Sequence, residues 1–274
     1  MKSSRAPAVR TRAIRPPRAE ERTDALKSLR KAIRVLECFS LQTPRLSLTD
    51  IAHQVGLPLS TTHRILATLR DVGLLEQQSD RDPYRLGLKL LELGSMVLAN
   101  MEVHREALPF IEALVRETGE TAHLGVFDGT QVVSIEKMDS PHGLASNVTI
   151  GKGAPAYCTG IGKALLAFQP DEVVTRVCRL GLKAYTPQTI TDAARLRKEL
   201  AQIRTLDYAV DDAEHQPDVR CVAAPIRNHS GTVIASLSLS GPATRIPKGR
   251  IPDLAVCVRG VAAKLSSRLG YRGQ

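Results

Sequence analysis

A short segment in the first third of the chain concentrates side chains that could bind nucleic acid. The hydroxyls of Ser60 and Thr61 are followed closely by the imidazole of His63 and the guanidinium of Arg64. In the first turn of a helix, short hydroxyls allow close approach to a phosphate, and an arginine can bind a phosphate or a guanine. The alternative is that these hydroxyls only cap a helix. Both interpretations require a helix that begins just before Ser60.

The residues around this segment have the pattern of a helix-turn-helix followed by a wing. Apolar residues at helical spacing predict three helices, and two short apolar runs with a turn-rich stretch between them predict a two-stranded wing. The predicted helices cover residues 29–39, 47–55 and 58–72, and the predicted strands cover residues 74–76 and 84–86. In a helix-turn-helix, the recognition helix lies in the major groove with its first residues toward the bases. The third helix is the one expected there.

Two further residues are expected at this DNA interface. Thr49 lies in the first turn of the second predicted helix, and Arg81 lies in the turn between the wing strands. Arg81 is a candidate phosphate contact, and the alternative is an exposed loop charge that contacts nothing. The predicted DNA-binding residues are Thr49, Ser60, Thr61, His63, Arg64 and Arg81.

The distribution of charge agrees with a polyanion-binding N-terminal region. The net charge is +10, and residues 1–90 hold 17 basic and nine acidic residues, whereas residues 91–274 hold 21 and 19. A basic N-terminal region followed by a nearly neutral remainder is typical of a protein that binds nucleic acid, although basic charge can also serve solubility alone. Residues 1–24 are rich in arginine and proline and have no apolar period, so we expect a basic, disordered arm. This arm could contact DNA phosphates or could be an idle tail.

Helical and strand patterns alternate after a further helix that joins the two parts of the chain. The joining helix, over residues 88–103, is more apolar than a spacer requires, and we expect it to pack against a partner chain. Further helices are predicted over residues 107–118, 160–168, 171–180, 193–205 and 251–269, and strands over residues 122–127, 131–136, 220–227 and 232–240. This mixture predicts an α+β domain, in which helices flank an antiparallel sheet.

A second set of polar residues lies in this larger domain and could bind an anion. Gly160 and Ile161 open an apolar helix, and the free N–H groups of a helix start attract carboxylates and phosphates. Ser238 and Ser240 are two residues apart on one strand, so their hydroxyls face the same side, with Cys221 on the neighbouring strand. These residues could form a small polar pocket. The alternative is that the strand serines face water.

The sequence gives little support to catalysis, metal binding or membrane insertion. The five cysteines lack the spacing of a zinc site or a redox pair, and the histidines show no metal-ligand spacing. Gly162-Lys163 resembles the end of a phosphate-binding loop, but Ala164 stands where a serine or threonine is needed. We therefore expect no catalytic residue, metal or cofactor. No apolar stretch is long enough to cross a bilayer, so we expect a cytoplasmic protein with no membrane partner.

The order of several short motifs resembles that of the IclR family of bacterial regulators. The likeness covers roughly residues 25–270 and rests on residues 56–66, 84–87, 91–94, 119–121, 158–167, 220–226 and 238–242. It implies a basic arm (1–24), a winged helix-turn-helix domain (25–87), a linker helix (88–105) and a GAF-like effector-binding domain (106–272). It also implies that the protein regulates transcription.

The resemblance further implies which residues bind an effector, which would be a small organic acid. The implied effector-binding residues are Leu144, Gly160, Ile161, Asp211, Cys221, Ser238 and Ser240. Ala145 stands where many relatives have arginine, and Asp218 stands where many have glycine, so the effector can differ from theirs.

The expected partners follow from the same resemblance. They are double-stranded DNA with a palindromic operator, the organic acid, and further copies of this chain in a homodimer or homotetramer. A DNA-binding oligomer with a C-terminal domain that senses nothing is the alternative. A small-acid enzyme with a DNA-binding appendage, in which Cys158 and His123 react, is a more distant one.

Overall fold

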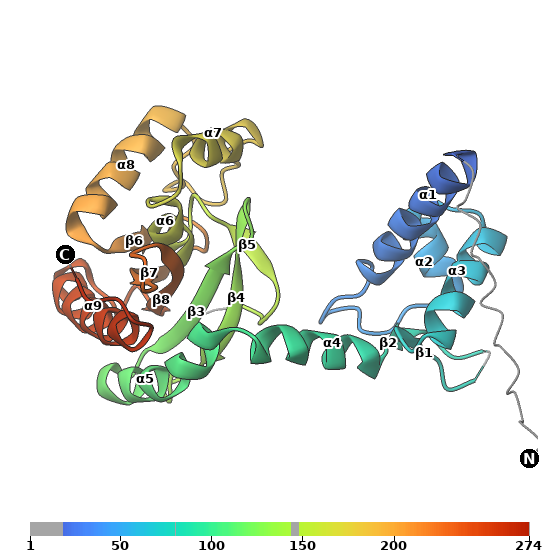
Figure 1. Cartoon of the computed structure of the whole chain (residues 1–274), viewed down its shortest axis with the longest axis horizontal. Helices are drawn as coiled ribbons and strands as arrows, with labels where there is room; N and C mark the ends of the chain where they lie inside the picture. The colour runs from blue at the N-terminus through green and yellow to red at the C-terminus, as the bar shows by residue number, and fades with distance from the viewer. Residues whose placement is uncertain (1–18, 80, 144–147, 274) are drawn as a thin grey trace, which may run out of the picture. The chain divides into compact units, whose positions relative to one another are not determined.

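The computed structural model describes residues 19–79, 81–143 and 148–273 and divides the chain into two compact units (Figure 1). The division falls between Met96 and Val97. Within the described residues, no helix is long and apolar enough to span a membrane. Each unit has a hydrophobic core of its own.

The N-terminal unit is the expected helix-turn-helix with a wing. Its elements are α1 (Ala19–Leu36), α2 (Leu48–Val55), α3 (Leu59–Asp71), β1 (Leu75–Glu76) and β2 (Arg85–Leu86), followed by α4 (Leu88–Ala99). The helices and the wing share one core, made by Val35, Leu46, Ile51, Val55, Leu66, Leu69, Leu75 and Tyr84. The helices and the wing thus form one folded body.

Local capping fixes the turn between α2 and α3. Ser47 and Asp50 form a capping box at the start of α2, in which each side chain accepts a hydrogen bond from the other residue's backbone N–H. Gly56 ends α2 with φ +63°, a left-handed conformation that glycine adopts without steric cost. Arg34 of α1 donates a 2.7 Å hydrogen bond to the carbonyl of Val55. These contacts therefore fix the turn that precedes α3, the predicted recognition helix.

Two expected boundaries differ from the structure. Helix α1 begins at Ala19, inside the segment expected to be a disordered arm, and residues 1–18 lie outside the described residues. The expected linker helix over residues 88–105 is instead two helices, α4 and a helix that starts at Glu102. Met101 caps this second helix with an extended backbone, so the helical path is interrupted there. Apolar periodicity alone does not reveal this break, because apolar residues resume their helical spacing after Met101.

The C-terminal unit is built on one antiparallel sheet of six strands in the order β5-β4-β3-β8-β7-β6. Its strands are β3 (Thr121–Phe127), β4 (Gln131–Met138), β5 (Gly153–Pro155), β6 (Ala209–Asp212), β7 (Val219–Arg227) and β8 (Val233–Pro242). Its helices are α5 (Glu102–Thr118), α6 (Gly160–Leu166), α7 (Asp171–Arg179), α8 (Ala193–Leu206) and α9 (Ile251–Arg268), with a short 3-10 helix, η1 (Lys248–Arg250). The predicted α+β class is confirmed, and β5 and β6 are strands that the sequence patterns did not reveal.

The two faces of this sheet are covered by different helices. Helices α5 and α9 pack on one face, with Val222, Ala224 and Ile226 of β7 in the core between them. Ala223, the residue of opposite phase, belongs instead to the core that includes α6, α7 and α8. Because side chains alternate along a strand, Leu237 and Leu239 of β8 point toward α5 and α9. Ser236, Ser238 and Ser240 then face the side of α6.

Candidate DNA interface and ligand pocket

The first turns of α3 present the predicted DNA-binding side chains at the surface. Ser60, His63 and Arg64 are exposed, and Thr61 is half-buried. Thr62 is fully buried, and its hydroxyl donates a 3.1 Å hydrogen bond to the carbonyl of Pro58. Helical periodicity therefore assigns Thr62 to the core and leaves its neighbours available for contacts with DNA.

Two surface depressions connect these side chains with neighbouring elements. Thr49, His63 and Arg81 line one depression, together with Ser47, Leu48, Arg70, Gln77, Asp82 and Tyr84. Thr61 and Arg64 line a second depression between α1 and α3, which also contains Lys31. Five of the six predicted residues thus line these two depressions. Lys31 and Arg70 are basic residues of this surface that the motif did not predict.

Side-chain hydrogen bonds hold the wing beside α3. The guanidinium of Arg70 donates to the amide oxygen of Gln77 at 3.0 Å, and the amide nitrogen of Gln77 donates to the carbonyl of Asp82 at 2.8 Å. Arg85 of β2 forms an ion pair with Glu76 of β1 at 2.8 Å. These contacts hold the wing, which carries the exposed Arg81, against the end of α3.

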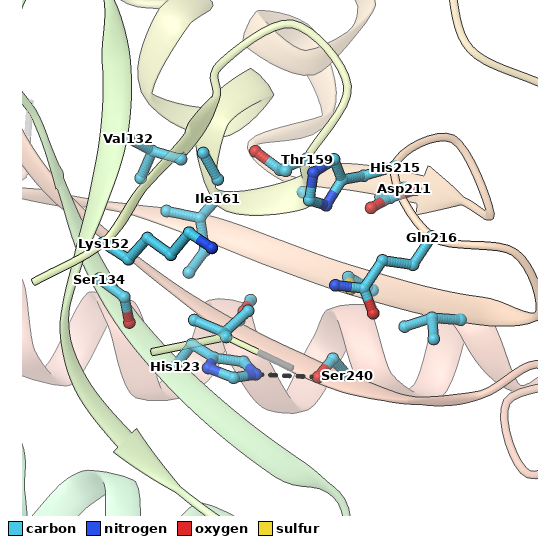
Figure 2. Close-up of a pocket in the computed structure, with 16 residues that line it drawn as sticks. His123, Val132, Ser134, Lys152, Thr159, Ile161, Asp211, His215, Gln216 and Ser240 are labelled. Carbon is cyan, nitrogen blue, oxygen red and sulfur yellow. Dashed lines mark hydrogen bonds between the residues drawn. The ribbon is translucent and has the colours of Figure 1, made fainter. Parts of the chain in front are cut away.

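In the C-terminal unit, one pocket brings together six of the seven predicted effector-binding residues. Gly160, Ile161, Asp211, Cys221, Ser238 and Ser240 all line it, and Leu144 lies outside the described residues. Residues that the sequence reasoning did not assign to the site complete its wall: His123, Val132, Ser134, Val148, Lys152, Ala154, Thr159, His215, Gln216 and Val219. Figure 2 shows this pocket.

The pairing of the strands brings together several polar residues that line the pocket. Asp211 of β6 pairs with Cys221 of β7, and Cys221 pairs in turn with Ser240 of β8. Ser238, in the next row, pairs with His123 of β3. The imidazole Nε2 of His123 lies 3.0 Å from the hydroxyl of Ser240 (Figure 2). Four strands therefore bring polar groups that are distant in sequence into one small area.

The start of α6 forms another wall of the pocket. Thr159 caps this helix: its hydroxyl accepts a 3.2 Å hydrogen bond from the N–H of Gly162 and donates a 2.8 Å bond to the carbonyl of Pro155. The N–H groups of Gly160 and Ile161 precede the first hydrogen bond within the helix. A Cβ atom at Gly160 would lie 3.2 Å from the Cβ of Cys221, so glycine allows this helix to approach β7 closely.

Burial keeps most of the titratable groups in this pocket uncharged near neutral pH. Burial lowers the pKa of His123 to about 4 and also lowers the pKa of His215. Burial raises the pKa of Asp211 to about 7, against the opposing effect of the N–H of Glu214, which donates to its carboxylate at 2.7 Å. Burial likewise raises the pKa of the Cys221 thiol well above its ordinary value. The pocket therefore offers mainly neutral hydrogen-bonding groups.

A buried ion cluster supports the wall that carries Asp211. Lys163 of α6 is fully buried, and its ammonium binds Glu199 of α8 at 3.0 Å and the carboxylate of Glu214. Burial alone would lower the pKa of Lys163, but the two carboxylates together raise it. Because Glu214 also donates to Asp211, the cluster joins α6, α8 and the segment after β6. Lys163 is thus a structural residue, and its likeness to a phosphate-loop lysine is coincidental.

The residues considered for catalysis do not form a reactive pair. His123 lines the pocket, whereas Cys158 is buried in the core among α6, α7 and α8 and does not line it. Burial raises the pKa of the Cys158 thiol, which disfavours the nucleophilic thiolate. Among the described residues, no group of three or more histidine, cysteine, aspartate or glutamate side chains could hold a metal ion.

Comparison with known proteins matches both units to one family. Residues 28–79 match the model of the IclR helix-turn-helix domain, and residues 95–267 match that of the C-terminal part of bacterial IclR transcriptional regulators. The chain is 34% identical over 247 residues to the HTH-type transcriptional regulator XynR of Escherichia coli strain K12. That match covers 90% of this chain and 98% of XynR.

Solved structures agree with the sequence matches. The IclR protein of Thermotoga maritima has a TM-score of 0.73 and 30% identity, and the match covers 90% of this chain and all of that one. An IclR homologue of Microbacterium hydrocarbonoxydans, complexed with 4-hydroxybenzoate, has a TM-score of 0.78 and 28% identity, with coverage of 88% and 98%. These relatives are transcription regulators and not enzymes. The chain therefore belongs to the IclR family of DNA-binding transcriptional regulators.

Proposed function

We propose that a small organic acid binds in the pocket of the C-terminal unit and changes how the protein binds a palindromic operator. The observation that carries this proposal is the convergence of Asp211, Cys221 and Ser240, in one cross-strand row, with the start of α6 and with Lys152 around a single cavity. Few polar groups in an otherwise apolar cavity are typical of a small-molecule site. The 4-hydroxybenzoate bound to the Microbacterium relative supports an acid as the ligand class.

The DNA-binding half of the proposal rests on the surface of α3, α2 and the wing. We infer that Thr49, Ser60, Thr61, His63, Arg64 and Arg81 contact the operator, as a recognition helix and wing do in this type of domain. All are at least partly exposed, and the two depressions described above contain five of them.

Replacement of Arg64 by alanine tests this interface. We expect it to weaken specific operator binding by at least about 1 kcal/mol, since a side chain that reaches a base edge contributes about that much. Fluorescence anisotropy with labelled operator measures the change. Arg259→Ala, at an exposed position of α9, removes the same charge from the other unit and serves as the matched control. Unchanged operator affinity in the Arg64 variant would remove this residue from the interface.

A thermal-shift screen against keto acids, sugar acids and aromatic acids tests the sensing half. A saturating ligand that binds only the folded state is expected to stabilise it by a few kcal/mol. The double variant Ser238→Ala, Ser240→Ala should lose the shift, because both hydroxyls line the pocket. The ligand must also alter operator affinity, which requires different affinities for two states of the protein. If no acid of the panel does either, the result contradicts the sensing proposal and favours the alternative, in which the C-terminal unit serves only oligomerisation.

A further inference from the structure

Charge is distributed unevenly around the pocket, and this distribution constrains the ligand. Among the described residues that line it, Lys152 carries the one permanent positive charge and Asp211 is the one carboxylate. They lie on opposite sides: Figure 2 shows Lys152 and Ser134 on one side, and Asp211, His215 and Gln216 on the other. A ligand that spans the pocket therefore meets a cation at one end and a different environment at the other.

Lys152 is available to bind an anion. Its ammonium forms no ion pair or hydrogen bond with any described residue, and Figure 2 shows it directed into the pocket beside Ile161. Lys152 is exposed at the mouth of the pocket, whereas two less exposed lysines of this unit are already engaged: Lys163 binds two carboxylates, and Lys137 binds Asp139 at 2.9 Å. A carboxylate that enters the pocket would therefore find its cationic partner at Lys152.

The opposite side suits a neutral group that both donates and accepts hydrogen bonds. Burial keeps His215 neutral, and Gln216 is uncharged. A second carboxylate there would face Asp211, with Glu214 directly behind it, and the nearby ammonium of Lys163 is committed to Glu199 and Glu214. A buried like-charge pair without a counter-ion is strongly unfavourable, so a hydroxyl fits this side and a carboxylate does not.

Apolar side chains make up part of the pocket lining. Val132, Ala154, Ile161 and Val219 line the pocket and offer no side-chain hydrogen bond, and Figure 2 shows Ile161 beside Lys152. The middle of the ligand should therefore be hydrocarbon, aromatic or aliphatic.

On the basis of the sensing function proposed above, we propose that Lys152 binds the ligand's carboxylate and that the pocket selects monocarboxylic acids with a distal hydroxyl over dicarboxylic acids. Lys152 is thus a specificity-determining residue that no motif of the sequence singled out.

Two matched ligand series test this proposal by calorimetry on the full-length protein. The aromatic series is 4-hydroxybenzoate, 4-hydroxybenzamide and benzene-1,4-dicarboxylate, and the aliphatic series is 4-hydroxybutyrate, 4-hydroxybutyramide and succinate. Lys152→Gln removes the positive charge, and Lys152→Arg keeps it. Lys264→Gln is the control, because it removes an exposed positive charge on α9 that does not line the pocket. Thermal unfolding of each variant checks that it is folded.

We expect the wild type to bind the hydroxy acid of one series at least tenfold more tightly than its amide and its dicarboxylate. Lys152→Gln should weaken binding of that acid at least tenfold and leave the amide within twofold, whereas Lys152→Arg and Lys264→Gln should bind it as the wild type does. If Lys152→Gln binds the acid with wild-type affinity, or if only dicarboxylic or keto acids bind, this inference is overturned and the sensing function stands. If no acid of these series or of the wider screen binds, both fail together.

Discussion

Asp211 is the residue of the pocket whose charge changes within the physiological pH range. Burial raises its pKa to about 7 and the charge of Glu214 adds to this rise, whereas the backbone N–H groups of Glu214 and His215 and the ammonium of Lys163 oppose it. Below pH 7 the protonated carboxyl can donate a hydrogen bond to a ligand. Above pH 7 the ionised carboxylate repels an anion.

The affinity for an acid ligand should therefore fall as pH rises. We expect roughly a tenfold loss between pH 6 and pH 8, because the protonated fraction of a group with a pKa near 7 falls by about that factor. Calorimetry at both pH values measures it. Asp211→Asn keeps an oxygen that can accept a hydrogen bond from the N–H of Glu214, but it does not titrate. The affinity of this variant for the acid should therefore change little between pH 6 and pH 8. If the affinity of the variant falls with pH as steeply as that of the wild type, the titrating group is not Asp211.

The same pKa makes a prediction about stability. The folded state holds the Asp211 proton more tightly than the unfolded chain does, so this stabilising contribution is complete below the ordinary pKa of 3.8 and is lost as pH rises through about 7. Asp211→Asn should consequently gain stability relative to the wild type between pH 5 and pH 8. Urea denaturation at both pH values measures the free energy of unfolding of the two proteins. If the difference between them is the same at pH 5 and pH 8, the raised pKa of Asp211 is contradicted.

At the scale of the elements, two aspartates occupy left-handed backbone positions and should respond differently to glycine. Asp207 ends α8 with φ +58°, and Asp218 precedes β7 with φ +59°. Asp207 also forms an ion pair with Arg227 at 2.6 Å, and the guanidinium of Arg227 lies over the Phe168 ring. The side chain of Asp218 is exposed and forms no hydrogen bond or ion pair with a described residue.

Asp218→Gly should therefore be neutral or stabilising by up to about 1 kcal/mol, because it relieves backbone strain at the cost of greater freedom in the unfolded chain. Asp207→Gly should instead destabilise the fold by about 1–3 kcal/mol, since it leaves Arg227 without its half-buried carboxylate. Chemical denaturation of both variants distinguishes the two positions. Equal effects would show that the Arg227 ion pair contributes nothing.

At the scale of the whole molecule, α4 exposes more apolar surface than a helix in water normally does. It has no buried residue, and Leu88 and Leu91 are 72% and 67% exposed, with Leu93, Met96 and Val97 also exposed. Large exposed apolar patches mark interaction surfaces. A palindromic operator also requires two DNA-binding units, which supports further copies of this chain as the partner.

The double variant Leu88→Glu, Leu91→Glu is expected to shift the protein toward the 29.8 kDa monomer and to weaken operator binding. Light scattering after size exclusion measures the mass, and anisotropy measures binding. Val256→Glu, at a similarly exposed position of α9, is the control. An unchanged oligomer in the double variant would show that α4 is not the interface.

Sequence patterns alone predicted most of the elements and the faces on which their side chains lie, because helical and strand periodicities are local. Apolar spacing indicated α2, α3 and the wing, and the alternation in β8 placed Ser238 and Ser240 on one face. Gly56 marked the turn before the recognition helix. The strand patterns also placed Cys221 on the strand next to these serines, and the family resemblance added Asp211, which no local pattern relates to them.

Which of these faces enclose a pocket depends on how the strands and helices pack together. The register that joins Asp211 to Cys221 and Ser240 forms between segments about ten to thirty residues apart, and no single segment encodes it. The short strands β5 and β6 depend on pairing with their neighbours, so their own residues gave no signal. For the same reason His123, Lys152, His215 and Gln216 joined the site only when the sheet, α6 and their connecting segments came together. Local sequence fixes what an element can present, and long-range packing fixes what it meets.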